Sequence, residues 1–264
     1  MYNKDHTFAI CAYEVNPYLE ECLLSVLNQK MKTNVIITTS TPNDYIKEIA
    51  AKYNVPLIIN SKYKAGVTED YNFAYHSAPT QYVTICHQDD IYLQDYSHSF
   101  YEASQKASNM LIFFSNYCEV RDGKKVSKSK VLNIKRFMLL PLKLKCLWKS
   151  KFVRRCILAF GSAICCPSVN YNKSNLQEPI FTYEFHALSD WCAWEAISRK
   201  KGEFVYCSKM LMGHRIHNES WTSQAIRDNV RESEEIRMFQ KFWPKPIANL
   251  IEVFYRQAEK SNEM

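Results

Sequence analysis

The chain has 264 residues, of which 47% are hydrophobic and 23% charged, and its formal net charge is +7 at pH 7. This composition excludes an intrinsically disordered chain, and the length allows one α/β domain or one domain with a small appendage. Five glycines are too few for long flexible linkers or glycine-rich nucleotide loops. The positive charge suits an anionic ligand, a nucleic acid or an anionic membrane surface without choosing among them.

The ten cysteines are scattered and never form a Cys-x-x-Cys pair. Cys165 and Cys166 are adjacent, which suits neither zinc nor an easy disulfide. The first residues lead directly into a strand-like segment, so we expect no signal peptide and reduced thiols in a cytoplasmic protein. No window reaches the roughly eighteen uninterrupted apolar residues of a membrane-spanning helix.

Strands and helices alternate along the N-terminal third of the chain. A short apolar run at 7–13 is followed by Asn16 and Pro17, which fit the cap and first turn of a helix. Apolar residues then recur every three or four positions, as in an amphipathic helix. Such alternation with short crossovers predicts a parallel, doubly wound sheet. The expected strands cover 7–13, 34–38, 55–60 and 82–86, and the expected helices cover 17–30, 41–53 and 68–77.

The fourth of these strands ends in two adjacent carboxylates, Asp89 and Asp90. Carboxylates are costly to desolvate unless they are paired or hold a cation. The carboxyl edge of an open α/β sheet is also where ligands bind. We therefore expect a divalent-metal site at this edge, with a solvated turn after the strand as the plainer alternative.

The second half continues with a basic insertion. Residues 121–155 are rich in lysine and arginine, contain Asp122 as their only acid, and interleave these charges with apolar residues. The segment either packs its apolar side on the domain or lies on an anionic membrane. The strands expected in this half cover 109–120 and 204–207, an apolar stretch at 159–169 is expected to return to the sheet, and the expected helices cover 95–108, 188–201, 228–241 and 247–259.

Four short motifs occur in a suggestive order. The first spans residues 12–29 and combines a strand end, a turn at Tyr13 and a helix that ends in Ser-Val-Leu-Asn-Gln. The others are Gln88-Asp89-Asp90, Ser189-Asp190-Trp191 and His214–Ser220. Together they resemble the family 2 glycosyltransferases of the GT-A fold, over about residues 5–225.

The resemblance implies a GT-A (Rossmann-like) α/β fold with a mixed, mainly parallel sheet flanked by helices. It implies a catalytic domain over 1–225, including the basic insertion, and a C-terminal helical extension over 226–264. Three departures bear on the donor. Glu14 stands where the family has asparagine, Thr39 begins a hydroxyl-rich stretch where aspartates are common, and Tyr71 stands where a basic residue is usual.

The chemistry of sugar transfer explains these residue types. A departing diphosphate builds negative charge, which Mn²⁺ or Mg²⁺ offsets, and the resemblance assigns this metal to Asp90 and His217. An attacking hydroxyl needs a base within hydrogen-bond reach, and the resemblance assigns that role to Asp190 in an inverting single displacement. Trp191 is expected to form a wall for the acceptor sugar. The expected donor-binding residues are Ala12, Tyr13, Glu14, Thr39, Ser40, Lys64, Asn72, Gln88, Asp89, Arg215 and Ser220.

Plainer roles exist for several of these residues. Asp190 could simply stabilise the start of a helix, His217 could be a structural histidine, and Tyr13 could be a core aromatic. A nucleotidyltransferase is an alternative function, although its glycine-rich phosphate loop is missing. A non-catalytic GT-A-like carbohydrate-binding or scaffold protein is another.

The resemblance also implies partners. They are a nucleotide-sugar donor, with a UDP-sugar as the first expectation, and a glycan or lipid-linked saccharide acceptor, as in bacterial polysaccharide biosynthesis. The basic insertion adds an anionic membrane surface, which would place the protein in the cytoplasm or peripherally at the inner face of the cell membrane. No nucleic-acid partner is expected, because no reading motif accompanies the basic segment.

Overall fold

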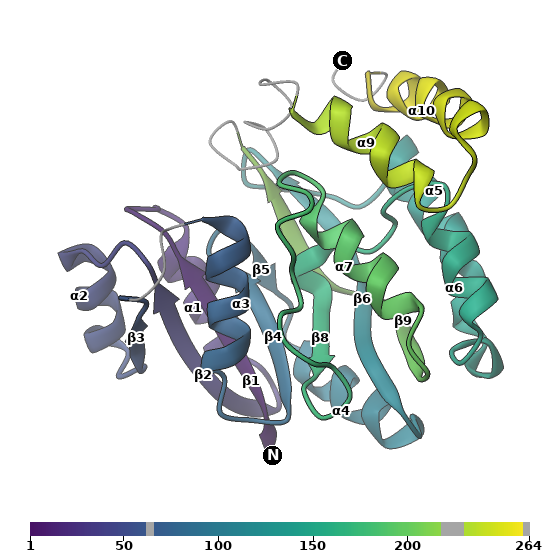
Figure 1. Ribbon diagram of the computed structural model, residues 1–264. Helices are drawn as coiled ribbons and strands as arrows, with labels where there is room; N and C mark the ends of the chain where they lie inside the picture. The colour runs from purple at the N-terminus through teal and green to yellow at the C-terminus, as the bar shows by residue number, and fades with distance from the viewer. Residues whose placement is uncertain (62–65, 218–229, 261–264) are drawn as a thin grey trace.

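A mixed sheet flanked by helices runs through the molecule (Figure 1). The computed structural model describes residues 1–61, 66–217 and 230–260. Within these residues nine strands form one sheet in the order β3-β2-β1-β4-β8-β6-β9-β5, with β7 paired to β6. The predicted α/β fold is confirmed, with parallel pairing throughout the N-terminal half. The other half is mixed, because β6 pairs parallel with β9 and the remaining pairs are antiparallel.

The N-terminal half places the ends of β1 and β4 side by side. Strand β1 pairs parallel with both β2 and β4. Phe8, Ala9 and Ile10 are fully buried because helices cover both sides of a parallel sheet, which explains the continuous apolar run. The elements are β1 (Tyr2–Ala12), α1 (Leu19–Leu27), β2 (Lys32–Thr39), α2 (Asp44–Lys52), β3 (Leu57–Ile59), α3 (Val67–Ser77) and β4 (Tyr82–His87).

The helix predicted at 17–30 begins later than its sequence signals suggested. Asn16 Oδ1 accepts a hydrogen bond from the backbone N–H of Tyr18 (2.8 Å), so it closes a turn before the helix instead of capping it. Helix α1 then starts at Leu19 and buries the face that the spacing of three and four predicted.

One long strand, β9 (Glu203–Ile216), replaces the short strand predicted at 204–207. The register against β6 is irregular at Ser115 and Asn116, and Ser208 and Lys209 are exposed there. Because these two residues are polar, the sequence pattern predicted that the strand ends before them. The longer strand reaches the ends of β4 and β5. The other elements here are β5 (Ile91–Tyr92), α4 (Tyr96–Lys106), β6 (Met110–Arg121), β7 (Lys124–Val126), β8 (Val169–Asn172) and α7 (Ser189–Ser198).

The basic insertion is helical and packs part of its apolar side on the domain. Leu132, Leu142 and Trp148 are buried, whereas Phe137 and Phe152 are 72% and 77% exposed. In the described part of the chain no helix is long and apolar enough to cross a membrane. The elements are α5 (Lys130–Met138), η1 (Leu140–Lys143), η2 (Lys145–Leu147), α6 (Lys151–Leu158) and, beyond the insertion, η3 (Cys166–Ser168).

Two C-terminal helices, α9 (Val230–Gln240) and α10 (Lys245–Lys260), pack on this core. Their Met238, Phe239 and Ala248 are fully buried. The ring of Phe239 meets Trp191 edge-on at 5.1 Å, and the Trp191 indole N–H donates to the carbonyl oxygen of Leu158 (3.0 Å). Trp191 is therefore a fully buried core residue, and the expectation that it walls an acceptor sugar is wrong. The division at residue 225 stays a prediction.

Candidate active site

A cavity of about 990 Å³ opens at the carboxyl ends of β1 and β4. One half is lined by the ends of β1, β4 and β9 and by the start of α3. The other half is lined by α5, by the segment before β8, by the turn into α7, and by α9 and α10. The cavity thus lies where ligands bind in open α/β sheets, and helices from the basic insertion and the C-terminus complete it.

Gln88 joins the two central strand ends. Its side-chain amide accepts from the backbone N–H of Tyr13 (2.9 Å) and donates to the Tyr13 carbonyl oxygen (2.9 Å). Tyr13, with Ala12 and Glu14, lines the cavity. Glu14 has a φ of 51°, a conformation that is strained for a residue other than glycine and is frequent at functional sites. These predicted donor-binding residues therefore lie together at the cavity.

Asp89 and Asp90 differ in their hydrogen-bond partners and in their burial. Asp90 is fully buried and accepts hydrogen bonds from the backbone N–H of Arg215 (2.8 Å) and from Nδ1 of His214 (3.0 Å). Asp89 lines the cavity and pairs with Nε2 of His217 at 2.8 Å. Burial would raise the pKa of Asp89, but the hydrogen bond from His217 and the nearby histidine charges outweigh it and lower that pKa.

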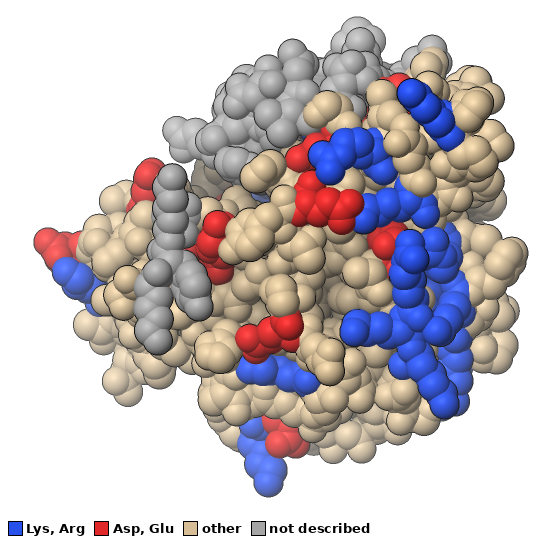
Figure 2. Space-filling model, in the orientation of Figure 1, with Lys and Arg blue, Asp and Glu red and all other residues tan. Residues whose placement is uncertain are grey.

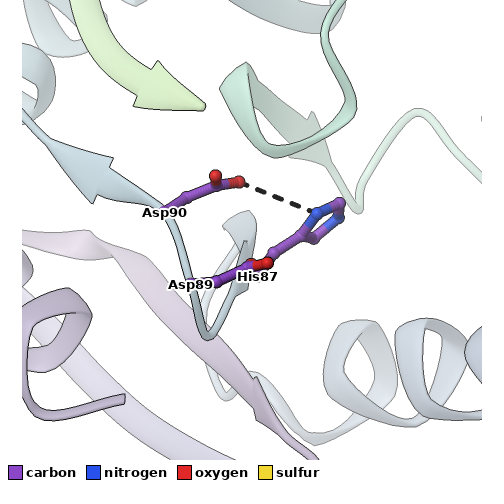
Figure 3. A group of neighbouring side chains, drawn as sticks. All are labelled: His87, Asp89 and Asp90. Atoms are coloured by element: carbon purple, nitrogen blue, oxygen red, sulfur yellow. Dashed lines mark ion pairs between the residues drawn. The ribbon is translucent and has the colours of Figure 1, made fainter. Parts of the chain in front are cut away.

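His87, Asp89 and Asp90 form a group that could hold a metal ion (Figure 3). One ligand atom from each lies within 4.8 Å of the others. In the described residues, His87 Nε2 and Asp90 Oδ2 are buried and have no hydrogen-bond partner, as expected of atoms that would bind a cation. Imidazole and carboxylate ligands suit a transition metal such as Mn²⁺. His87 was missed as a ligand, although it ends the strand just before the acid pair.

Arg215 does not face the cavity. Its Nε donates to the carbonyl oxygen of Asp89 (2.8 Å), its Nη2 pairs with Glu21 (2.5 Å), and its guanidinium stacks 4.1 Å from the ring centre of Tyr18. The direct donor contact predicted for Arg215 is therefore wrong, because these partners occupy the guanidinium. What Arg215 does is hold the backbone of Asp89.

Asp190 lines the opposite part of the cavity from the first turn of α7. Its Oδ1 accepts from the backbone N–H of Trp191 (2.6 Å). Burial raises the pKa of Asp190, and this effect exceeds the lowering by that hydrogen bond and by the positive charges of Arg231 and Lys135. A carboxylate with a raised pKa in a cavity is suited to accept a proton.

Three further predicted donor residues, Asn72, Thr39 and Ser40, do not line the cavity. Asn72 binds the backbone of Ile180 and Phe181 through its amide, so its predicted donor contact is wrong. Thr39 is buried and its Oγ1 accepts from the backbone N–H of Thr41 (3.1 Å). Thr39 and Ser40 do not line the cavity, which corrects both predictions. Lys64 and Ser220 lie outside the described residues.

Several lining residues escaped the sequence analysis. Helix α5 contributes Val131, Ile134, Lys135 and Met138, and α10 contributes Tyr255. The α5 residues are three and four positions apart, which is the spacing of one helix face and could have predicted them. The basic composition of 121–155 suggested a peripheral segment instead.

This fold and site define a GT-A type glycosyltransferase. The chain belongs to glycosyl transferase family 2, whose family model matches residues 7–159. The predicted family and enzyme class are thereby confirmed. A search of curated proteins gave no match.

Solved structures of glycosyltransferases share the fold. The Staphylococcus aureus (S. aureus) TarS fragment 1–349 superposes with a TM-score of 0.63 at 13% identity, covering 97% of this chain and 72% of that one. The same fragment in complex with UDP-GlcNAc superposes with a TM-score of 0.62 at 14% identity, covering 97% of this chain and 73% of that one. The mannosyltransferase PcManGT from Pyrobaculum calidifontis, in complex with GDP-Man and Mn²⁺, gives 0.62 at 13% identity, covering 97% and 68%.

Proposed function

We propose that this glycosyltransferase moves a sugar from a nucleotide-diphosphate sugar to a hydroxyl of a glycan or lipid-linked saccharide, with inversion at the anomeric carbon. The observation that carries the proposal is that one cavity is lined both by Asp89, from the metal-binding group, and by Asp190. The diphosphate of the donor needs a metal-binding group, and the hydroxyl of the acceptor needs a base such as Asp190.

On the donor side, His87, Asp89 and Asp90, with His217 paired to Asp89, would hold a divalent cation. When bound, such a cation offsets the negative charge that grows on the departing diphosphate. The imidazole favours Mn²⁺ over Mg²⁺, which prefers oxygen ligands alone. The complexes of TarS with UDP-GlcNAc and of PcManGT with GDP-Man and Mn²⁺ support a nucleotide-sugar donor, and a UDP-sugar is the first candidate.

On the acceptor side, Asp190 would act as the base. Its carboxylate takes the proton of the acceptor hydroxyl, whose oxygen forms the new bond to the anomeric carbon. The bond between that carbon and the diphosphate oxygen breaks, and the nucleoside diphosphate leaves with the electron pair. One displacement inverts the configuration. Ile134, Met138 and Tyr255 give this half of the cavity apolar walls beside the ammonium of Lys135, which suits an amphipathic, lipid-linked acceptor.

The experiment is a panel of sugar nucleotides with Mn²⁺, read by donor-dependent melting and by nucleoside diphosphate release. We expect one donor to be bound and turned over. Asp190→Asn should keep donor binding and lose about 100-fold or more in transfer rate, as expected for loss of a general base. The exposed Asp44 serves as the control through Asp44→Asn. Absence of any donor response from the parent, or parental transfer by Asp190→Asn, would refute the proposal.

We further propose that the protein works at the inner face of the cell membrane. Lysines and arginines gather over α6 and its neighbourhood (Figure 2). The exposed lysines of the basic insertion include Lys143, Lys145, Lys149 and Lys151. Phe137, Leu140, Leu144 and Phe152 from the same segment are exposed as well, as are Ile247, Leu250, Val253 and Phe254 of α10. Basic and exposed apolar side chains together favour an anionic bilayer.

A further inference from the structure

Helix α9 holds the turn that leads to Asp190. This turn, residues 184–188, runs directly into α7. Glu234, Arg237 and Lys241, from α9 and the residue after it, all contact the turn. Their spacing of three and four places them on one side of the helix. The C-terminal helices are thus in direct contact with the segment that presents the proposed base.

The Glu234 carboxylate accepts three backbone hydrogen bonds from the turn. Its Oε1 accepts from His186 N–H (2.7 Å), and its Oε2 accepts from Ala187 N–H (2.8 Å) and Leu188 N–H (3.1 Å). Glu234 is only 4% exposed. Hydrogen bonds to a buried carboxylate are shorter and stronger than neutral ones, so the three fix the backbone of successive residues at once.

Two cations anchor the other end of the same turn. The guanidinium of Arg237 lies 4.8 Å from the ring centre of Phe185, and its Nη2 donates to the carbonyl oxygen of Glu184 (3.3 Å). Lys241 Nζ pairs with the Glu184 carboxylate at 2.7 Å. Because these contacts are exposed, they hold the turn to α9 more weakly than the buried hydrogen bonds of Glu234 do.

We infer that Glu234 is a positioning residue for sugar transfer, acting through Asp190. Ala187, Leu188 and Asp190 line the cavity, whereas Glu234 does not. Asp190 Oδ1 is bound to the backbone N–H of the next residue, so the direction of the carboxylate follows the backbone that Glu234 holds. This inference rests on the proposed role of Asp190 as the base.

The test compares two matched substitutions. Glu234→Gln keeps the shape but places an amide N–H₂ donor against backbone N–H donors. Glu203→Gln is the control, because Glu203 is also buried and accepts from two backbone N–H groups, those of Ser108 (2.8 Å) and Asn109 (3.2 Å). Glu203 does not line the cavity. Both variants should melt at lower temperature than the parent.

Turnover is measured with UDP-GlcNAc or GDP-mannose and Mn²⁺, using whichever the parent consumes faster. We expect kcat of Glu234→Gln to fall by about tenfold or more with an unchanged donor KM, because misplacing a catalytic group costs rate and not donor binding. Glu203→Gln should keep kcat within about twofold. Parental kcat in Glu234→Gln, or an equal loss in Glu203→Gln, overturns the inference.

Hydrogen exchange gives a readout that does not depend on turnover. The amides of residues 186–188 should lose protection in Glu234→Gln and keep it in Glu203→Gln, because their acceptor is changed only in the first. Unchanged protection at 186–188 also overturns the inference. A parent that consumes neither donor is a failure of the proposed function, visible without any variant, and exchange then decides whether Glu234 holds the turn.

Discussion

Asp89 and Asp90 are neighbours in sequence, yet only Asp89 lines the cavity. Both follow the end of β4 at His87, where Asp89 is partly exposed at the cavity and Asp90 is fully buried. His214 and the backbone N–H of Arg215 both bind Oδ1 of the buried Asp90, and its Oδ2 has no hydrogen-bond partner in the described residues. The acid pair therefore ties β4 to β9 through one member and presents charge to the cavity through the other.

The pKa of Asp190 predicts the pH dependence of transfer. A base works only when deprotonated, and burial raises the pKa of this carboxyl above its ordinary value. The rate should therefore fall as the pH drops through that raised pKa, at a higher pH than for an exposed aspartate of pKa about 3.9. The measurement is kcat against pH with saturating donor. A rate that stays constant down to about pH 4 would contradict the assignment of Asp190 as base.

At the scale of elements, Arg154 of α6 fastens the end of α7. Its Nε and Nη1 donate to the carbonyl oxygens of Ser198 (2.8 Å) and Gly202 (2.8 Å), and its Nη2 donates to that of Lys200. The residue is 1% exposed, and burial lowers its pKa to about 10. The Ser198 carbonyl belongs to the last residue of α7 and the other two follow the helix, where carbonyls lack partners within it. A buried arginine thus caps the helix that carries Asp190.

Replacing Arg154 should destabilise the fold. Arg154→Met leaves the three carbonyls without their donor, and we expect the free energy of unfolding to fall by about 3 kcal/mol. Arg154→Lys should recover part of this loss, since an ammonium retains donors. Urea unfolding measures the change, with the exposed Lys151→Met on the same helix as control, expected within about 0.5 kcal/mol of the parent. An equally small effect for Arg154→Met would contradict the capping role.

At the scale of the whole molecule, the sheet lines one half of the cavity and helices line much of the other. The parallel strands bring Tyr13 and Asp89 to one edge, and the long strand β9 adds His214, with His217 directly after its end. Helices α5, α9 and α10 supply the facing wall. Segments distant in sequence therefore share one cavity, and the basic insertion lies partly at this cavity and partly on the outer surface.

The proposed membrane contact predicts vesicle binding that depends on charge. Flotation with anionic phosphatidylglycerol vesicles should carry the parent at low salt and lose it at high salt. Replacing Lys143, Lys145, Lys149 and Lys151 by glutamine should abolish flotation. The control removes the same charge from exposed lysines elsewhere, namely Lys4, Lys47, Lys106 and Lys209. Equal flotation of both variants, or none by the parent, would count against the membrane surface.

The sequence by itself determined the alternation of elements, the fold class and the family. The continuous apolar runs and the three-four spacing in the N-terminal half are local consequences of burial in a parallel sheet. The sequence also pointed to four site residues, because carboxylates and histidines at the ends of elements are unusual in a core. They also occur in the order of the family motifs. These residues are Asp89, Asp90, Asp190 and His217. These predictions needed only neighbouring residues.

Only the tertiary structure decided what those residues face. Trp191 and Asn72 look like ligand residues in the sequence, yet one is packed under Phe239 and the other binds the backbone of Phe181. Lys135 and Glu234 look peripheral, yet one lines the cavity and the other holds the turn before Asp190. The physical reason is that burial and hydrogen-bond partners are set by segments far apart in the chain, which no local pattern records.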